Sequence, residues 1–149
     1  MREKNLQNED FWDEDLDRKN TERMKEIIAE IGWPTISKVG LESAHSGWLL
    51  VQHADHDVDF QRRCLELMKQ APEGEVSKQD IAYLEDRVRV NQNQPQLYGT
   101  QFTQDGEKHI PKPIEDQERV DSRRTEMGLD ALQEGIDRMN EKYTASSEA

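Results

Sequence analysis

The chain is poor in the residues from which many folds and sites are built. It contains a single cysteine, Cys64, which excludes an intramolecular disulfide framework. Hydrophobic residues make up 33% of the chain and aromatic residues 6%, against 35% charged residues, so the core must be lean. No run approaches the roughly 20 apolar residues that span a bilayer. With 149 residues, this composition is typical of one small domain with one core.

Several catalytic and binding signatures are missing as well. The chain has no Gly-rich phosphate loop, no GxSxG motif, no HExxH and no CxxC. ATP use and serine-hydrolase chemistry therefore have no support in the sequence. Blocks of lysine and arginine are also absent, and the net charge is −12. Because so acidic a chain is repelled by phosphates and by anionic lipids, we predict no nucleic-acid partner and no membrane partner.

The acidic charge is densest near the start of the chain. Six carboxylates and no basic residue lie between Glu9 and Asp17. We interpret residues 1–16 as an acidic, loosely ordered arm, with a surface that docks onto a basic protein partner as the alternative. Met1-Arg-Glu-Lys4 leads into polar sequence rather than into an apolar stretch, so we expect no signal peptide and a cytoplasmic location. The oligomeric state does not follow from the sequence.

Apolar periodicity predicts a mainly α fold, a single-domain bundle of about six helices with one short β-hairpin. The domain is expected to cover residues 17–143, followed by a flexible tail over 144–149. The expected helices cover residues 17–31, 41–54, 58 onward, 78–90, 117–127 and 130–143. The hairpin is expected to join strands 96–103 and 107–112 at an Asp105-Gly106 turn. The predicted N-caps are Asp57, Ser77 and Asp116.

Apolar stripes at helical spacing identify the expected core. In the first helix the stripe consists of Met24, Ile27, Ile28 and Ile31. In the second helix it consists of Leu41, Ala44, Trp48 and Val51. Gly32 stands at the C′ position of the first helix, and Cys64 is most simply a small core residue.

The most informative segment follows the apolar run of the second helix, where His53, Asp55, His56 and Asp57 stand close together. A histidine titrates near neutrality, as general acid–base catalysis requires, and an aspartate can orient its imidazole. In the structural interpretation, Asp57 only caps the next helix and a histidine binds a helix-end carbonyl. For any one of these residues taken alone we favour the structural interpretation. For the cluster as a whole, the catalytic and the structural interpretation both remain open.

A metal site is the second functional interpretation of the same residues. Histidine nitrogens and aspartate oxygens suit zinc, manganese or iron, and the candidate ligands are His53, His56 and Asp57. His45 does not complete the set, because it lies about 80° around the helix from His53. We therefore predict no cofactor and keep a divalent metal as the lesser alternative.

Tyr98-Gly-Thr-Gln101 is a further candidate for binding. In a strand, Gly99 lets a ligand approach the backbone closely, and Tyr98 and Gln101 can donate hydrogen bonds to a substrate oxygen. The alternative, which we favour on these residues alone, is a strand selected for β propensity.

Two pairs of charged residues can be interpreted in two ways. Asp86-Arg87, and Asp121 with Arg124, can contribute an anion-binding arginine or a solvated salt bridge. The spacing of Asp121 and Arg124 favours the salt bridge.

Six segments, taken in chain order, resemble one known family. They are Gly32-Trp-Pro34, Trp48 to Asp57, Tyr83 to Arg87, Gln96 to Gln101, Val120 to Arg124 and Gly128-Leu129. The family is a group of small bacterial proteins catalogued only as a domain of unknown function, number 6624, and the resemblance covers about residues 24–140. Its motif positions here are His53, His56, Asp57, Tyr98 and Gln101. Val58 stands where the family pattern has a proline, a replacement that a first helical turn accepts. The resemblance implies one folded domain and no assigned reaction.

Two functions follow from these residues. The first is a small enzyme with hydrolase-like general acid–base chemistry on a small polar substrate, in which the hairpin brings Tyr98 and Gln101 toward His53 and His56. Asp57, Asp86 and Arg87 would support that site. The alternative is an acidic protein–protein interaction module without catalysis, which docks onto a basic partner.

Overall fold

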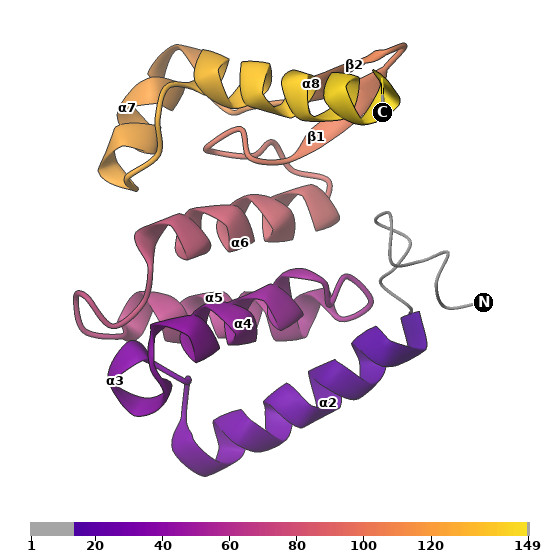
Figure 1. Ribbon diagram of the computed structural model, residues 1–149. Helices are drawn as coiled ribbons and strands as arrows, with labels where there is room; N and C mark the ends of the chain where they lie inside the picture. Colours follow the sequence, from indigo (N-terminus) through magenta and orange to yellow (C-terminus); the bar gives the residue numbers. More distant parts are fainter. Residues whose placement is uncertain (1–13, 149) are drawn as a thin grey trace. The chain divides into compact units, whose positions relative to one another are not determined.

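The computed structural model describes residues 14–148. In this part of the chain it contains seven α-helices, one short 3-10 helix and one two-stranded antiparallel hairpin (Figure 1). The predicted mainly α fold with one hairpin is therefore confirmed. Contacts cluster into two compact units, an N-terminal unit, Met1–Ser77, and a C-terminal unit, Lys78–Ala149. The single domain over residues 17–143 stays a prediction, and residues 1–13 of the predicted arm lie outside the described residues.

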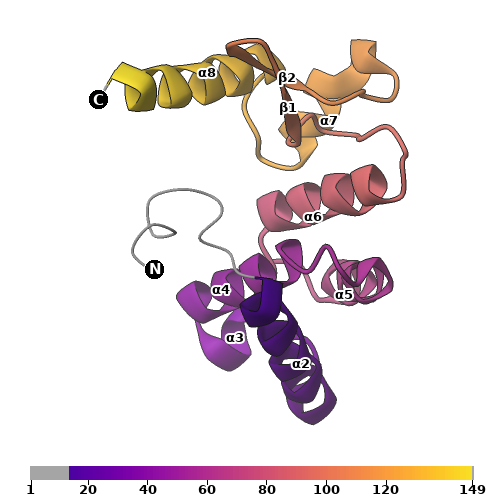
Figure 2. The same ribbon diagram turned by 90° about the vertical axis from the view of Figure 1, so that its right-hand side faces the viewer.

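The N-terminal unit is built around one apolar helix. Its helices are α2 (Glu14–Ile31), α3 (Ile36–Val39), α4 (Leu41–Gln52) and α5 (Val58–Gln70). The helices α2, α3 and α5 each contact α4, which is the most apolar of them (Figures 1 and 2). The first helix starts at Glu14 rather than at Asp17, because carboxylates in a first turn are favoured by the helix dipole. Part of the predicted acidic arm is therefore helix.

The core of the N-terminal unit follows most of the predicted stripes. Its buried apolar side chains include Met24, Trp33, Trp48, Val51, Phe60, Cys64 and Met68. Burial raises the pKa of the Cys64 thiol to about 12, which keeps it protonated as an inert core residue. Two stripe predictions are wrong: Ile31 is 42% exposed and Leu41 is 67% exposed. Ile31 is the last residue of α2, before Gly32, and Leu41 is the first residue of α4, after Gly40. At these helix ends the apolar side chain is left exposed to solvent.

The C-terminal unit combines helices with the hairpin. Its elements are α6 (Lys78–Asn91), β1 (Phe102–Asp105), β2 (Lys108–Pro111), the 3-10 helix η2 (Gln117–Arg119), α7 (Val120–Glu126) and α8 (Leu132–Glu148). The second strand packs on α8 (Figure 2), where the Asn140 side chain accepts from the His109 amide nitrogen at 2.8 Å and donates to the His109 carbonyl at 3.0 Å. None of the helices within residues 14–148 is long and apolar enough to cross a membrane.

Several predicted boundaries in the C-terminal unit are wrong. Asp105 pairs with Lys108, so the turn residues are Gly106 and Glu107, and Gly106 has the positive φ of 64° that such turns require. The Asp116 side chain makes no capping hydrogen bond, and the Asp116 backbone is left-handed at φ 45°. The helix α8 continues to Glu148, so residues 144–148 of the predicted tail are helical.

Candidate functional site

The histidine segment in the N-terminal unit is a capped turn. Asp57 Oδ1 accepts a hydrogen bond from the Phe60 amide at 3.1 Å, which confirms its predicted role as the N-cap of α5. Asp57 Oδ2 accepts from Lys25 Nζ on α2 at 3.0 Å. Partial burial opposes ionisation, but the hydrogen bonds from Lys25 and Phe60 prevail and lower the pKa of the Asp57 carboxyl. This carboxylate therefore joins two helices.

The two histidines of this segment lie in different environments. His53 is half-buried and ends α4, where its amide donates to the Leu49 carbonyl at 3.2 Å. His56 is exposed. Within residues 14–148, no three His, Cys, Asp or Glu side chains gather as metal ligands would. His53, His56 and Asp57 are thus not gathered as a three-ligand set in the described part of the chain, and a metal at these residues stays a prediction.

Gln61 is a buried polar residue that the sequence analysis missed. Its Nε2 donates to the Val51 carbonyl at 3.0 Å and lies 3.3 Å from both the Gln52 carbonyl and Asp55 Oδ1. Carbonyls at a helix end have no partner within the helix, and Gln61 satisfies two of them at the end of α4. Its helical spacing from the buried Leu65 and Met68 is the signal that marks it as inward-facing.

Two substitutions of Asp57 distinguish the contribution of its capping hydrogen bond to stability from the contribution of its charge. Asp57→Ala is expected to lower the free energy of unfolding by about 1 kcal/mol, the usual contribution of an N-cap, whereas Asp57→Asn keeps the cap and loses the ion pair with Lys25. Because the pKa is lower in the folded state, the stabilisation by charge is complete above the unfolded pKa and is lost as the pH falls through the folded pKa. Urea unfolding at neutral and acidic pH should therefore show the gap between wild type and Asp57→Asn closing in acid. A gap that is unchanged at the two pH values would contradict this role.

The C-terminal unit contains a buried carboxylate that organises a loop. Asp86 on α6 is 0% exposed and accepts four hydrogen bonds. Its Oδ1 accepts from the amides of Leu97 and Tyr98 at 2.8 and 3.0 Å, and its Oδ2 from the amide and hydroxyl of Thr100 at 3.0 and 2.7 Å. Burial raises the pKa of Asp86, and the hydrogen bonds from Thr100, Leu97 and Tyr98 act in the opposite direction. Because these amides bind a side chain, residues 97–100 form a loop, and the predicted strand there is wrong.

Two glutamines close the same loop. Gln96, which is fully buried, donates from Nε2 to the carbonyls of Gln101 and Lys112, and its Oε1 accepts from the Gln101 amide, each at 2.9 Å. The Gln101 side chain accepts from Arg87 at 3.0 Å and donates to Thr100 Oγ1 at 3.1 Å. Gln101 is therefore a buried part of the loop, and its side-chain amide is engaged in hydrogen bonds inside it.

Adjacent arginines on α7 hold the outer side of the loop. Arg123 donates to the carbonyls of Leu97, at 2.8 Å, and Glu115. Arg124 is 3% exposed and donates from Nη1 to the Tyr98 carbonyl at 2.7 Å. The predicted surface pair of Asp121 with Arg124 is therefore wrong. Instead, Asp121 accepts from the Leu132 amide at the start of α8 at 2.8 Å.

Arg124 and Arg138 share one carboxylate. Arg124 Nη2 lies 3.1 Å from Asp130 Oδ1, and Arg138 donates to both oxygens of Asp130, at 2.7 and 3.2 Å. The hydrogen bond from Arg138, opposed by slight burial and helped by Arg124, lowers the pKa of Asp130. Two guanidinium groups of the same charge are thereby held side by side.

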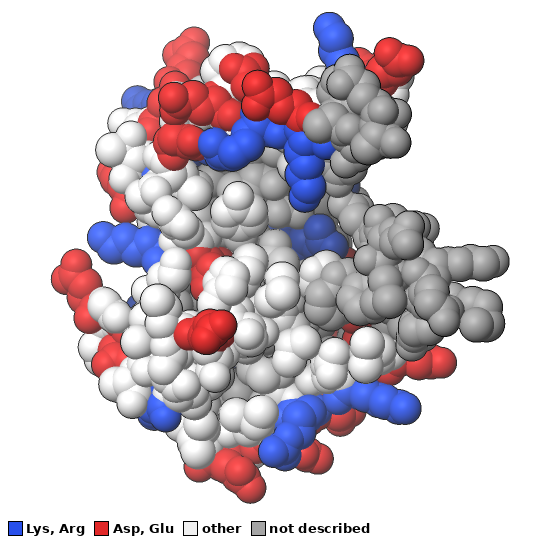
Figure 3. Space-filling view, in the orientation of Figure 1, with Lys and Arg blue, Asp and Glu red and all other residues white. Residues whose placement is uncertain are grey.

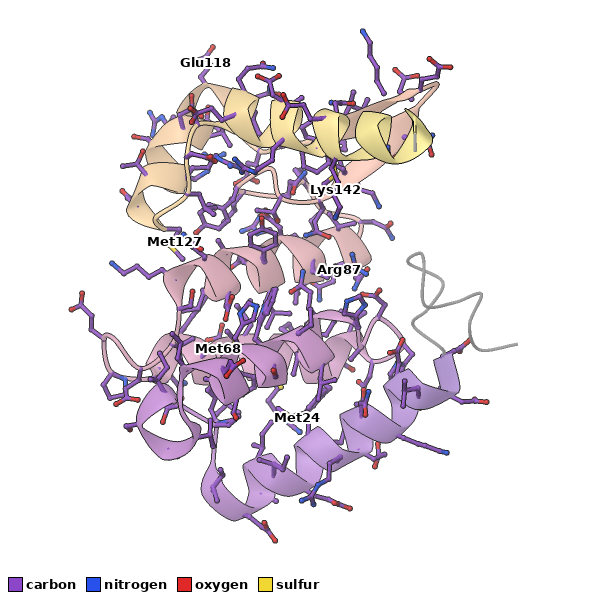
Figure 4. All side chains as sticks on the ribbon, in the orientation of Figure 1. Met24, Met68, Arg87, Glu118, Met127 and Lys142 are labelled. Atoms are coloured by element: carbon purple, nitrogen blue, oxygen red, sulfur yellow. The ribbon has the colours of Figure 1, made fainter. Side chains whose placement is uncertain are left out.

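A cavity of about 300 Å³ opens beside these arginines, within the C-terminal unit. Its polar lining consists of Tyr83, Thr100, Arg124, Arg138 and Lys142, and its remaining lining of Gly99, Phe102, Gly135 and Met139. Figure 3 shows Lys and Arg side chains gathered under α8 on the viewed face, and Figure 4 shows Lys142 on the side of α8 that faces α6. The lining has three cationic side chains and no acidic one.

The helix α8 presents one stripe to this cavity. Gly135, Arg138, Met139 and Lys142 follow the spacing i, i+3, i+4, i+7, which places them on one helical face. At Gly135 a Cβ atom would lie 3.0 Å from Arg124 Nη2, so the missing side chain leaves room for the guanidinium against the helix. The cavity is thus formed by the residue spacing on α8 and by the close approach of Arg124 to Gly135.

The motif residues of the sequence analysis divide between the two units. Asp86, Arg87, Tyr98 and Gln101 come together in one hydrogen-bonded network of the C-terminal unit. His53, His56 and Asp57 belong to the N-terminal unit. The predicted acid–base site made from both sets stays a prediction.

The fold and site define a mainly α-helical protein whose buried carboxylate orders a loop beside a cationic cavity. The chain belongs to the Family of unknown function (DUF6624), whose family model matches residues 12–147. The resemblance inferred over residues 24–140 is thereby confirmed and extended. Comparison with curated proteins and with solved structures finds no similar protein.

Proposed function

We propose that the protein binds a small organic anion in the cavity of its C-terminal unit. The observation that carries the proposal is the cationic lining. Arg124, Arg138 and Lys142 line the cavity without an acidic residue, in a chain whose 32 acidic residues outnumber its 20 basic ones. In so acidic a protein, a concave surface of one positive sign attracts anions more strongly than its surroundings do.

Charge and hydrogen-bonding capacity both support an anion. Asp130 pairs with Arg124 and Arg138 and offsets part of their charge, while the charged side chains that line the cavity itself are all cationic. A guanidinium has five N–H groups, and Arg138 directs only Nη1 and Nη2 toward Asp130, so its other donors suit a carboxylate or phosphate. Such groups are the preferred partners of arginine because their two oxygens match the planar fork.

The size and apolar lining of the cavity support an organic ligand. A volume of about 300 Å³ lies at the lower end of small-molecule sites. Phe102 and Met139 line it beside the cations, so a ligand with a carbon skeleton buries apolar surface there in addition to its charge. The proposal therefore sharpens the small polar ligand expected from the sequence to a small organic anion.

Arg138→Gln tests the proposal, with Arg62→Gln as a matched control. Both arginines are exposed and paired with a nearby aspartate, but Arg62 lies on α5 in the N-terminal unit. Titration calorimetry with small carboxylates and phosphate monoesters should show binding to wild type and to Arg62→Gln, and binding about tenfold weaker to Arg138→Gln, since a charge-assisted hydrogen bond contributes about 1.5–3 kcal/mol. Equal affinities of the two variants, or no binding of any anion by wild type, would contradict it.

A further inference from the structure

We infer that the ligand of this cavity carries an anionic group at each end of an apolar middle. This inference rests on the proposed anion binding and names the class of ligand. It follows from the order in which cationic and apolar side chains succeed one another along α8.

The three cations lie at successive levels of the helix. Arg124 reaches α8 at Gly135, where its Nη2 lies 3.0 Å from the position that a Cβ atom would occupy. Arg138 and Lys142 follow on the same face. With a rise of 1.5 Å per residue, Lys142 stands about 10 Å along the axis from Gly135 and about 6 Å from Arg138. A ligand that contacts both ends of this row must be elongated.

The two ends of the row differ in chemistry. At one end Asp130 pairs with both Arg124 and Arg138, so two guanidinium groups lie beside one another there. The Arg124 side chain is 4% exposed and that of Arg138 is 62% exposed, so this end reaches from the cavity floor to its rim. At the other end Lys142 supplies a single ammonium group. The guanidinium end suits bidentate recognition, whereas the ammonium end acts as a point charge.

An apolar side chain of α8 stands between Arg138 and Lys142, and the rest of the lining is partly apolar. Met139 follows Arg138 on α8, and Phe102 at the start of β1 lines the same cavity. Methylene groups in the middle of a ligand would bury apolar surface against Met139 and Phe102. Linear dicarboxylates such as pimelate have this arrangement, and heptanoate offers the same chain with one carboxylate.

Pimelate and heptanoate test the inference on four forms of the 149-residue chain. These are wild type, Lys142→Gln, Arg138→Gln and the control Lys108→Gln, which removes one exposed positive charge from β2, outside the cavity lining. In titration calorimetry, wild type and Lys108→Gln should bind pimelate about tenfold more tightly than heptanoate. Lys142→Gln should lose that preference and keep its affinity for heptanoate. Arg138→Gln should bind both compounds more weakly.

The possible failures are distinct. If wild type binds both compounds equally, or if Lys142→Gln weakens both by the same factor, the two-ended ligand is wrong while anion binding stands. If Lys108→Gln loses the preference as Lys142→Gln does, the preference reflects net charge alone and the inference is overturned. If wild type binds neither compound, nor any of the other anions, the inference and the proposed function fail together.

Discussion

Asp86→Ala is expected to lower the free energy of unfolding by about 3–5 kcal/mol, as the loss of a buried charged partner commonly does. The substitution leaves the amides of Leu97, Tyr98 and Thr100 and the Thr100 hydroxyl without the acceptor that now binds all four. Burial of the carboxylate itself is unfavourable, as its raised pKa indicates, and this cost offsets part of the loss. The expected value is therefore smaller than the sum of four charged hydrogen bonds.

Two further variants make this result specific. Asp86→Asn keeps the shape but turns one acceptor oxygen into a donor that faces amide groups, so its loss should be intermediate. Asp137→Ala removes an exposed aspartate of α8 and should change the free energy of unfolding by less than about 0.5 kcal/mol. Urea unfolding followed by far-ultraviolet circular dichroism measures all three. An Asp86→Ala protein within about 1 kcal/mol of wild type would show that Asp86 does not organise the loop.

Gly99→Ala is expected to lower the free energy of unfolding by about 2–4 kcal/mol, which combines a backbone and a packing effect. Gly99 has φ 71°, in the left-handed region that disfavours a side chain. Its added Cβ would also lie 2.6 Å from Leu132 Cδ1 and 3.2 Å from Ile114 Cδ1, so at least one of these buried or half-buried residues must move.

Gly106→Ala provides the matched control for Gly99→Ala. Gly106 has a similar φ of 64°, but a Cβ atom there would have nothing within 4 Å. Gly106→Ala should therefore show only the backbone effect, about 1–2 kcal/mol. The difference between the two variants in urea unfolding isolates the crowding at Leu132 and Ile114. Equal losses would mean that the loop relaxes without cost and that the close approach is unimportant.

Features that depend on neighbouring residues were predictable from the sequence. The Asp57 cap, the Gly32 turn and the core position of Cys64 each follow from spacing within one or two helical turns. The helices α4, α5 and α6 begin where the pattern places them, because apolar stripes and caps act locally. The exposed Leu41 shows the limit of this reasoning, since an apolar stripe does not reveal which of its residues another part of the chain covers.

The loop around Asp86 was not predictable in the same way. Its acceptor and its donors are separated by up to 14 residues, and no periodicity connects them. The segment from Gln96 to Gln101 has strand-like composition, but a buried carboxylate binds three of its amides, so its pairing is limited to an isolated bridge between Gln96 and Ile114. The cavity depends on Arg124 reaching Gly135 across the α7–α8 connection, which is again a contact between separate elements. In the sequence, the charged pairs Asp86-Arg87 and Asp121 with Arg124 pointed to this part of the C-terminal unit, but not to its contacts.

Asp86, Gln96, Arg123 and Arg124 all bind backbone groups of one short segment. Backbone groups are the same in every residue, so exchanging the side chain at Leu97 leaves the hydrogen bonds of its amide and carbonyl in place. Inserting or deleting one residue there would displace the amides of Tyr98 and Thr100 from Asp86 together. Over this stretch the fold thus selects the number of residues between Asp86 and Thr100 more strictly than most of their identities.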